Sequence, residues 1–171
     1  MSAYSHVATR HWRAALAAVL IGLLAACAQP GRVVPGTPAP DVLRELGAPT
    51  ARYALPGGGE RLQYSMQPAG QSVYNIDTDA TGRVARVEQA LNEALFGQRI
   101  QPNVWTRADV LREYGPPART MRVHSFHGDV WVWRYLDGPT WRLLFIDVDP
   151  EGRVRGYSSG DENLPDPPEP R

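Results

Sequence analysis

The hydrophobic residues of this chain recur with two spacings, and each spacing predicts one kind of element. A three-to-four-residue spacing predicts short helices beginning near Asp41 and Asp109. Gly47 and Gly115 follow these runs, with prolines just beyond them, so both helices are expected to end there. Alternation of apolar and polar residues predicts strands in two later blocks. The helical residues are Val42, Leu43, Leu46, Val110, Leu111 and Tyr114, and the strand residues are Leu62, Tyr64, Met66, Trp131, Trp133 and Tyr135.

The two blocks are copies of each other. Asp41–Pro49 matches Asp109–Pro117 at seven of nine positions, with an offset of 68 residues. Ile76–Val84 matches Ile146–Val154 at six of nine, with an offset of 70. Two matches in the same order at nearly the same offset indicate an internal duplication, which is typical of repeat architectures.

Each copy continues with a strand and a tight turn. The runs 73–78 and 141–148 precede turns that open with Asp and close with Gly, at 79–82 and 149–152. The predicted fold class is α+β, with two tandem repeats, each a short helical region followed by a three-stranded antiparallel sheet. We assign residues 41–90 to the first repeat and 104–158 to the second. The segment 91–103 is expected to link them, and its leucines favour a short helix there.

The N-terminal segment predicts export and a lipid anchor. Residues 1–13 contain two arginines and no acid, and residues 14–24 are apolar, which is typical of a signal peptide and too short for a membrane span. Leu24-Ala25-Ala26-Cys27 then resembles the lipobox of bacterial lipoproteins. That resemblance implies cleavage of residues 1–26, a diacylglycerol on the Cys27 thiol and an acyl group on its new amino terminus. No other cofactor is expected.

The composition of the chain excludes an internal disulfide and argues against nucleic acid as a partner. Cys27 is the only cysteine, so no internal disulfide can form. The whole chain has 18 basic and 18 acidic residues, so it shows no excess of basic residues of the kind that binds nucleic acid. Residues 27–40, rich in Pro and Gly, predict a flexible tether. Residues 159–171, acidic and rich in Pro, predict a disordered tail.

The apolar strand residues predict a buried face and a candidate interface. Trp133 and Tyr135, like Leu62 and Tyr64, are expected to face the helices. The opposite face of the second sheet is more apolar than that of the first, so it requires a cover. Either the other repeat or a partner protein could supply this cover, and both alternatives stay open. The candidate interface consists of Val132, Trp141, Leu143 and Phe145.

Residue patterns for catalysis or metal binding are weak. His124 and His127 are interpreted as polar residues of a hairpin turn, because in a strand they would point to opposite faces. An EF-hand-like spacing in the first copy has Ser158 at its last position in the second copy, so we favour turns in both. We find no nucleophile elbow and no phosphate loop, and we predict a non-enzymatic protein without a metal site. The EF-hand-like residues are Asp77, Asp79, Thr81, Gly82 and Glu88.

Together these motifs resemble the SmpA/OmlA (BamE-like) domain of bacterial outer-membrane lipoproteins, here in two copies over residues 36–158. The resemblance implies an outer-membrane location on the periplasmic face and function through protein–protein contacts, with the β-barrel assembly machinery as a partner. Ala28, in place of Asp after the cysteine, agrees with that location. The alternative is an enzyme inhibitor, resembling beta-lactamase inhibitor protein, or a peptidoglycan-associated binding module. The motif residues are Thr106–Leu111, Gly115–Pro117, Trp133–Tyr135 and Asp149–Val154.

Overall fold

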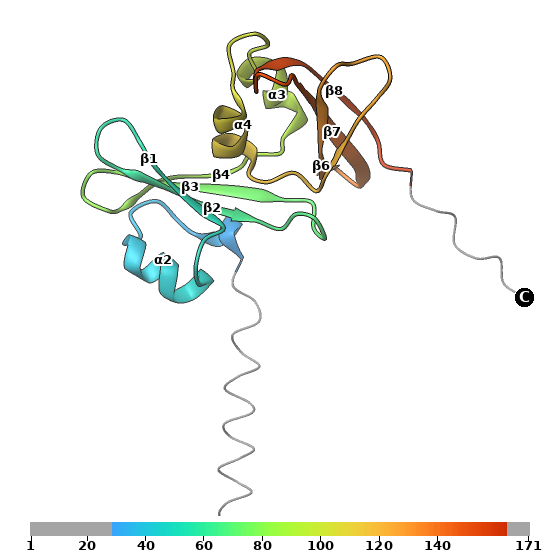
Figure 1. Cartoon of the computed structure of the whole chain (residues 1–171). Helices are drawn as coiled ribbons and strands as arrows, with labels where there is room; N and C mark the ends of the chain where they lie inside the picture. The colour runs from blue at the N-terminus through green and yellow to red at the C-terminus, as the bar shows by residue number, and fades with distance from the viewer. Residues whose placement is uncertain (1–28, 164–171) are drawn as a thin grey trace, which may run out of the picture.

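The computed structural model describes residues 29–163. The predicted signal segment 1–26, its lipobox and Cys27 lie outside the described residues, as does the end of the predicted tail, 164–171. The fold is α+β, with two four-stranded antiparallel sheets (Figure 1). In the part of the chain that the structure describes, no helix is long and apolar enough to cross a membrane.

The first repeat places one helix on one face of a sheet. A short 3-10 turn, η2 (Pro30–Arg32), precedes the helix α2 (Ala39–Leu46). Four strands follow, and their order in the sheet is their order in the chain. Gly47 ends α2 with a positive φ of 78°, as its sequence position predicts. The strands are β1 (Ala51–Ala54), β2 (Glu60–Ser65), β3 (Val73–Thr78) and β4 (Val84–Gln89).

The second repeat has the same plan. α3 (Glu93–Arg99) lies within the segment expected to link the repeats, and α4 (Arg107–Tyr114) corresponds to α2. Thr106 caps α4 in a full capping box with Asp109, which satisfies backbone N–H groups that have no partner within the helix. The strands are β5 (Arg119–Met121), β6 (Asp129–Asp137), β7 (Thr140–Val148) and β8 (Val154–Asp161). A β-bulge occurs at equivalent places in both sheets, near Asp77 and Asp147.

The prediction of three strands per sheet was wrong, because each sheet begins with an additional short strand. β1 has four residues and pairs with β2, and β5 has three residues and pairs with β6. All three residues of β5 are exposed, and half of those in β1 are. Strands of three or four residues are too short for an alternating pattern to be recognised in the sequence, and β5 also has no buried face.

The tether and tail boundaries also require correction. Pro30 is buried, and the backbone of Gly31 lies so close to Tyr74 that a Cβ there would approach the ring within 2.9 Å. The chain therefore packs on the first sheet well before residue 40. At the other end, residues 159–161 belong to β8, and the backbone N–H of Glu162 still bonds the carbonyl of Trp141.

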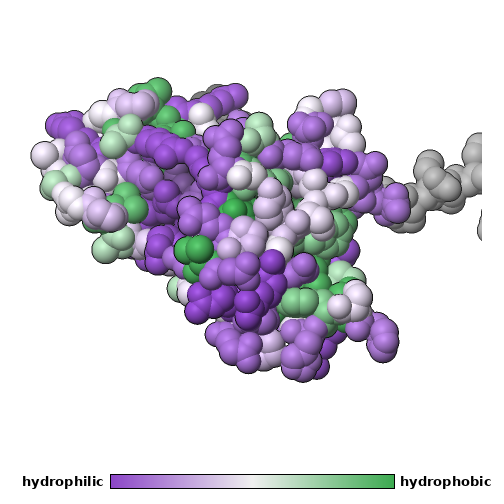
Figure 2. All heavy atoms as spheres, turned by 90° about the horizontal axis from the view of Figure 1, so that it is seen from above, coloured by the Kyte–Doolittle hydropathy of each residue, from purple (hydrophilic) through white to green (hydrophobic). Residues whose placement is uncertain are grey.

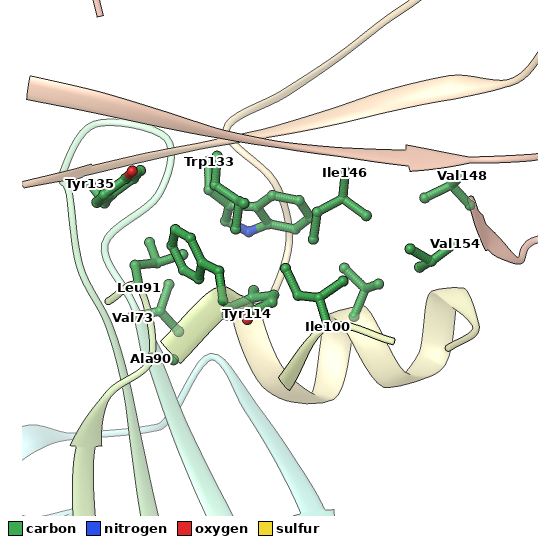
Figure 3. Close-up of a cluster of buried hydrophobic side chains, with 13 residues drawn as sticks. Val73, Ala90, Leu91, Ile100, Tyr114, Trp133, Tyr135, Ile146, Val148 and Val154 are labelled. Atoms are coloured by element: carbon green, nitrogen blue, oxygen red, sulfur yellow. The ribbon is translucent and has the colours of Figure 1, made fainter. Parts of the chain in front are cut away.

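Two hydrophobic cores lie between the helices and the sheets. Leu62 and Tyr64 pack with Val42 of α2, and Trp133 and Tyr135 face the helices of the second repeat, as predicted (Figure 3). The second core also contains residues from the first repeat and the segment after it. Its members from that part of the chain are Val73, Ala90, Leu91, Phe96 and Ile100, and all five are buried.

The two Asp-x-x-Gly segments form hairpin turns, as the sequence indicates. Asp79 Oδ1 accepts bonds from the backbone N–H and hydroxyl of Thr81 and from the N–H of Arg83. Asp149 Oδ1 accepts from the N–H of Arg153 in the second copy. Within residues 29–163, no group of three or more His, Cys, Asp or Glu side chains could hold a metal ion.

Candidate functional site: the loop side of the second repeat

The duplication provides an internal comparison, because features shared by both copies maintain the common fold. α2 and α4 begin 68 residues apart, as do β1 and β5. The copies differ in the loop that follows the first strand of each sheet. In the first repeat this loop covers residues 55–59, whereas in the second it covers residues 122–128. Loops on a rigid scaffold are where binding residues concentrate, so the longer loop is the candidate site.

The longer loop forms one wall of a pocket of about 370 Å³. Three basic side chains line this pocket: Arg107 of α4, and Arg122 and His127 of the loop. The remaining wall is apolar, apart from one carboxylate at the start of β6. The lining residues are Arg107, Arg122, Val123, Phe126, His127, Gly128, Asp129 and Pro150.

The pocket has an excess of positive charge. Nη2 of Arg107 donates to the backbone carbonyl of Asp149 at 3.4 Å and has no carboxylate partner within the described residues. The Asp149 carboxylate instead accepts bonds from the Arg153 N–H and from Arg155 Nε, and the first of these contributes most to lowering its pKa. Arg122 is 86% exposed and pairs with Asp129 at 3.2 Å. An anionic group can therefore bind here.

The first repeat lacks this charge at equivalent positions. Ala39 corresponds to Arg107 and Ala54 to Arg122, both at the offset of 68 residues. At Gly59 the shorter loop is so close to the Thr78 carbonyl that a Cβ there would be 1.9 Å from the oxygen. The basic pocket is therefore a feature of the second copy alone, and the shared fold does not require it.

The loop also packs against a cluster that contains two of the four predicted interface residues. Val132 is fully buried and Leu143 is 6% exposed, in a cluster with Val130 that Val123 and Phe126 of the loop contact. The sequence allows two covers for this face, the other repeat and a partner protein. The structure adds a third contribution, because Val123 and Phe126 of the chain's own loop pack against the cluster.

The other two predicted interface residues lie at the margin of this cluster. Phe145 is half-buried against it, and Trp141 is half-buried below the guanidinium of Arg134, which lies 5.3 Å from the ring centroid. The first repeat reaches this margin through Gln67, whose Nε2 donates to the Arg134 carbonyl at 2.7 Å. The candidate interface thus stays a prediction that rests on Phe145 and Trp141.

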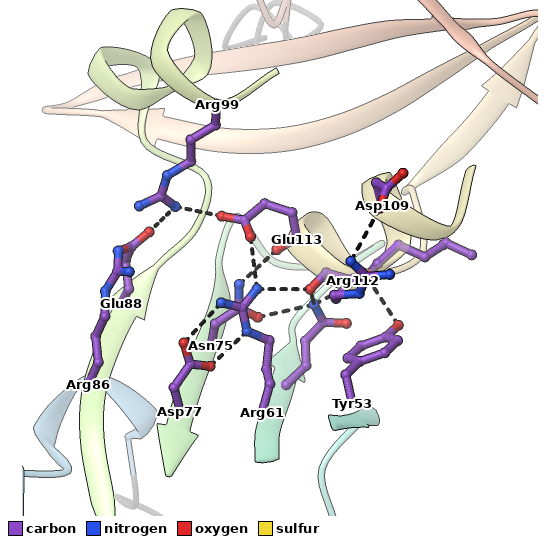
Figure 4. A network of polar contacts seen from close by, with 12 residues as sticks. Tyr53, Arg61, Asn75, Asp77, Arg86, Glu88, Arg99, Asp109, Arg112 and Glu113 are labelled. Atoms are coloured by element: carbon purple, nitrogen blue, oxygen red, sulfur yellow. Dashed lines mark hydrogen bonds and ion pairs between the residues drawn. The ribbon is translucent and has the colours of Figure 1, made fainter. Parts of the chain in front are cut away.

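A second pocket, of about 320 Å³, lies at the junction of the repeats. Arg61 pairs with Asp77 and Glu113, Arg99 pairs with Glu113 and Glu88, and Arg86 pairs with Glu88 (Figure 4). Because the charges in this network are matched within the chain, it is suited to holding the repeats together. On the face drawn in Figure 2, hydrophobic residues form small groups separated by hydrophilic ones.

Comparison of the chain with protein-family models, curated proteins and solved structures finds no match. The resemblance to the SmpA/OmlA domain therefore rests on the sequence motifs quoted above. Sequence analysis identified His127 as a loop residue but did not identify Arg107, Arg122 and Phe126 as its neighbours. The sequence signal that could have identified Arg107 and Arg122 is that the first copy has alanine, Ala39 and Ala54, at the matching positions.

Proposed function

We propose that this chain is a non-enzymatic, lipid-anchored envelope protein that acts through protein–protein contacts in outer-membrane assembly or integrity. The observation that carries the proposal is Leu24-Ala25-Ala26-Cys27, placed directly after an apolar run and containing the only cysteine of the chain. One acyl chain holds a protein only marginally at a membrane, whereas two or three make attachment stable. A triacylated Cys27 would keep both repeats at the outer membrane, on its periplasmic face.

The loop side of the second repeat supports a binding role. Arg107 and Arg122 present positive charge beside the apolar side chains of Val123 and Phe126. Arginine beside apolar and aromatic groups is enriched at protein interfaces, where it pairs with carboxylates in a fixed geometry. The partner that fits this surface presents an acidic group next to an apolar residue.

Lipidation is tested by labelling cells that express the full chain with a radioactive or clickable palmitate and by measuring the mass of the mature product. We expect label on the native chain and none on Cys27→Ser, which should leave the membrane fraction. Gly22→Ala is the matched control, because it alters the apolar run and keeps the lipobox. An unmodified residue 27 in the native product contradicts the proposal.

The binding role is tested by mild crosslinking in intact cells, with identification of the captured proteins. Capture of β-barrel assembly components supports the proposal, provided that Arg107→Ala together with Arg122→Ala reduces it. Both substitutions introduce the residue that the first repeat has at the same position, so the fold should tolerate them. Capture of a soluble periplasmic enzyme instead would indicate the inhibitor alternative, and capture of peptidoglycan fragments would indicate the binding-module alternative.

A further inference from the structure

The strand β8 is an unpaired edge of the second sheet. The sheet order ends with β8, and β7 is its only strand neighbour among residues 29–163. Its first residue is covered on the other side, because the Val154 N–H bonds the Trp105 carbonyl and the Val154 carbonyl accepts from Asn103. Beyond that residue, no described loop pairs with the outer edge of β8. Of the seven strand residues that follow Val154, alternate ones therefore point their backbone donors and acceptors away from β7, toward solvent.

Beyond the bulge at its first residues, this edge has few of the features by which proteins prevent strands from pairing with other chains. Short length, lysine and proline are common protections of edge strands. β8 is eight residues long, against six for the corresponding β4, and it contains neither lysine nor proline. The middle of β8 is Gly-Tyr-Ser-Ser-Gly, in which every residue except Tyr157 is small and offers little obstruction to an approaching strand.

The sequence of β8 is nearly symmetric about Ser158. Arg155-Gly-Tyr-Ser-Ser-Gly-Asp161 has glycine two residues on either side of Ser158 and opposite charges three residues on either side. In an antiparallel pair of two such strands, Ser158 would oppose Ser158 of a second copy, and Gly156 would oppose Gly160. Arg155 would then oppose Asp161 at both ends. A two-fold interface requires this kind of self-complementarity, because each residue contacts its symmetry counterpart.

We propose that β8 pairs in antiparallel orientation with β8 of a second copy, with Ser158 on the two-fold axis, so that the two second sheets form one continuous sheet. The alternating side chains permit this register. Gly156, Ser158 and Gly160 lie on the same face as Asp147, Phe145 and Leu143 of β7, to which they are paired, so β8 itself places no bulky side chain on that face of the edge.

The charged ends of the strand remain accessible for this contact. Asp161 is 68% exposed although it pairs with Arg142, and Arg155 is 48% exposed although it pairs with Asp149. A second ion pair at each end of the interface would extend existing networks rather than replace them. Because these pairs are exposed, they are expected to fix the register, while backbone hydrogen bonds between the strands supply most of the attraction.

The register is tested with single cysteines in the full chain carrying Cys27→Ser, so that the added thiol is the only one. Directly opposed residues in an antiparallel pair have Cα atoms about 4.5–5.5 Å apart, within the range that a disulfide bridges. Ser158→Cys should therefore form an intermolecular disulfide on mild oxidation. Ser159→Cys is the matched control, because the two copies of residue 159 would be about 8 Å apart.

We expect Ser158→Cys to crosslink at least tenfold faster than Ser159→Cys. Equal rates at the two positions, or no disulfide at either, would overturn the proposed register. Asp161→Arg, added to Ser158→Cys, should slow crosslinking several-fold, because Arg155 of the second copy would then oppose an arginine. Asp137→Arg makes the same charge change on β6 and should have no effect. An equal response to both arginine substitutions would contradict the charge pairing. These outcomes do not depend on lipidation of Cys27.

Discussion

Asn75 provides a direct test of how the repeats are joined. Its side chain is 2% exposed on the face of the first sheet opposite α2, where the C-terminal end of α4 packs. Nδ2 donates to the Glu113 carbonyl at 2.8 Å, and Oδ1 accepts from Gln63 Nε2 at 3.1 Å. This carbonyl lies in the last turn of α4, where carbonyls have no partner within the helix. In the second repeat the corresponding residue is Phe145, so the polar contact is particular to the junction.

Asn75→Leu keeps the side-chain volume and removes both hydrogen bonds. Each bond contributes about 1 kcal/mol, and a buried carbonyl left without a partner costs about 1–3 kcal/mol. We therefore expect the free energy of unfolding to fall by about 2–4 kcal/mol in urea titrations followed by tryptophan fluorescence. Asn163→Leu is the control, since residue 163 is exposed, and it should change stability by less than about 0.5 kcal/mol.

A double-mutant cycle separates the direct bond from the rest of the junction. Gln63 Nε2 also donates to the carbonyls of Leu111 and Arg112, so Gln63→Leu should be destabilising alone. The coupling energy between residues 63 and 75 should be about 1 kcal/mol. A loss below about 1 kcal/mol for Asn75→Leu, together with no coupling, would show that the polar contacts do not hold the repeats together.

Three further predictions concern the second repeat. Trp133→Ala should lower the free energy of unfolding by about 3–5 kcal/mol in urea, because the indole is fully buried and its N–H bonds the Gly115 carbonyl; a smaller loss would mean that the core is loosely packed. Thr106→Ala should cost about 0.5–2 kcal/mol in the same assay by removing the capping box, whereas Thr106→Ser should restore most of it. Glu93 has its pKa lowered to about 2, chiefly by the hydrogen bond from Arg142. A carboxylate with a depressed pKa in the folded state contributes stability above its unfolded pKa, near 4.3, and this contribution is lost as the pH falls toward 2. The melting temperature of Glu93→Gln should therefore fall less over that pH range than the melting temperature of the native chain. An equal fall in both proteins would contradict this role of Glu93.

Much of the fold follows from patterns that are local in the sequence. The duplication placed both helices and the main strands, because the apolar residues that define them also form the cores. β1 and β5 escaped prediction because they are only four and three residues long, and the residues of β5, such as Arg119 and Thr120, are all exposed. Their pairing depends on a neighbouring strand, which a local pattern does not contain.

The junction between the repeats and the candidate site were less accessible to prediction, for a related reason. Gln63 and Asn75 are polar residues at outward-facing strand positions, and such positions are normally taken as solvated. The structure buries them because α4, which begins more than thirty residues later in the chain, packs on that face. Arg107 and Arg122 likewise meet only through the tertiary fold. A comparison of the two copies, residue by residue, was the one signal able to identify them in advance.

The second core includes Val73, Ala90 and Leu91, so the chain cannot be cut between the two repeats without opening that core. A fragment starting at residue 104 would leave that core open to water on the side these residues now close, together with the side covered by Phe96. The core of the downstream half is therefore completed by residues that precede it in the chain. Truncation between the halves should yield an aggregating fragment, and any shuffling of this module between proteins would have to move both halves together.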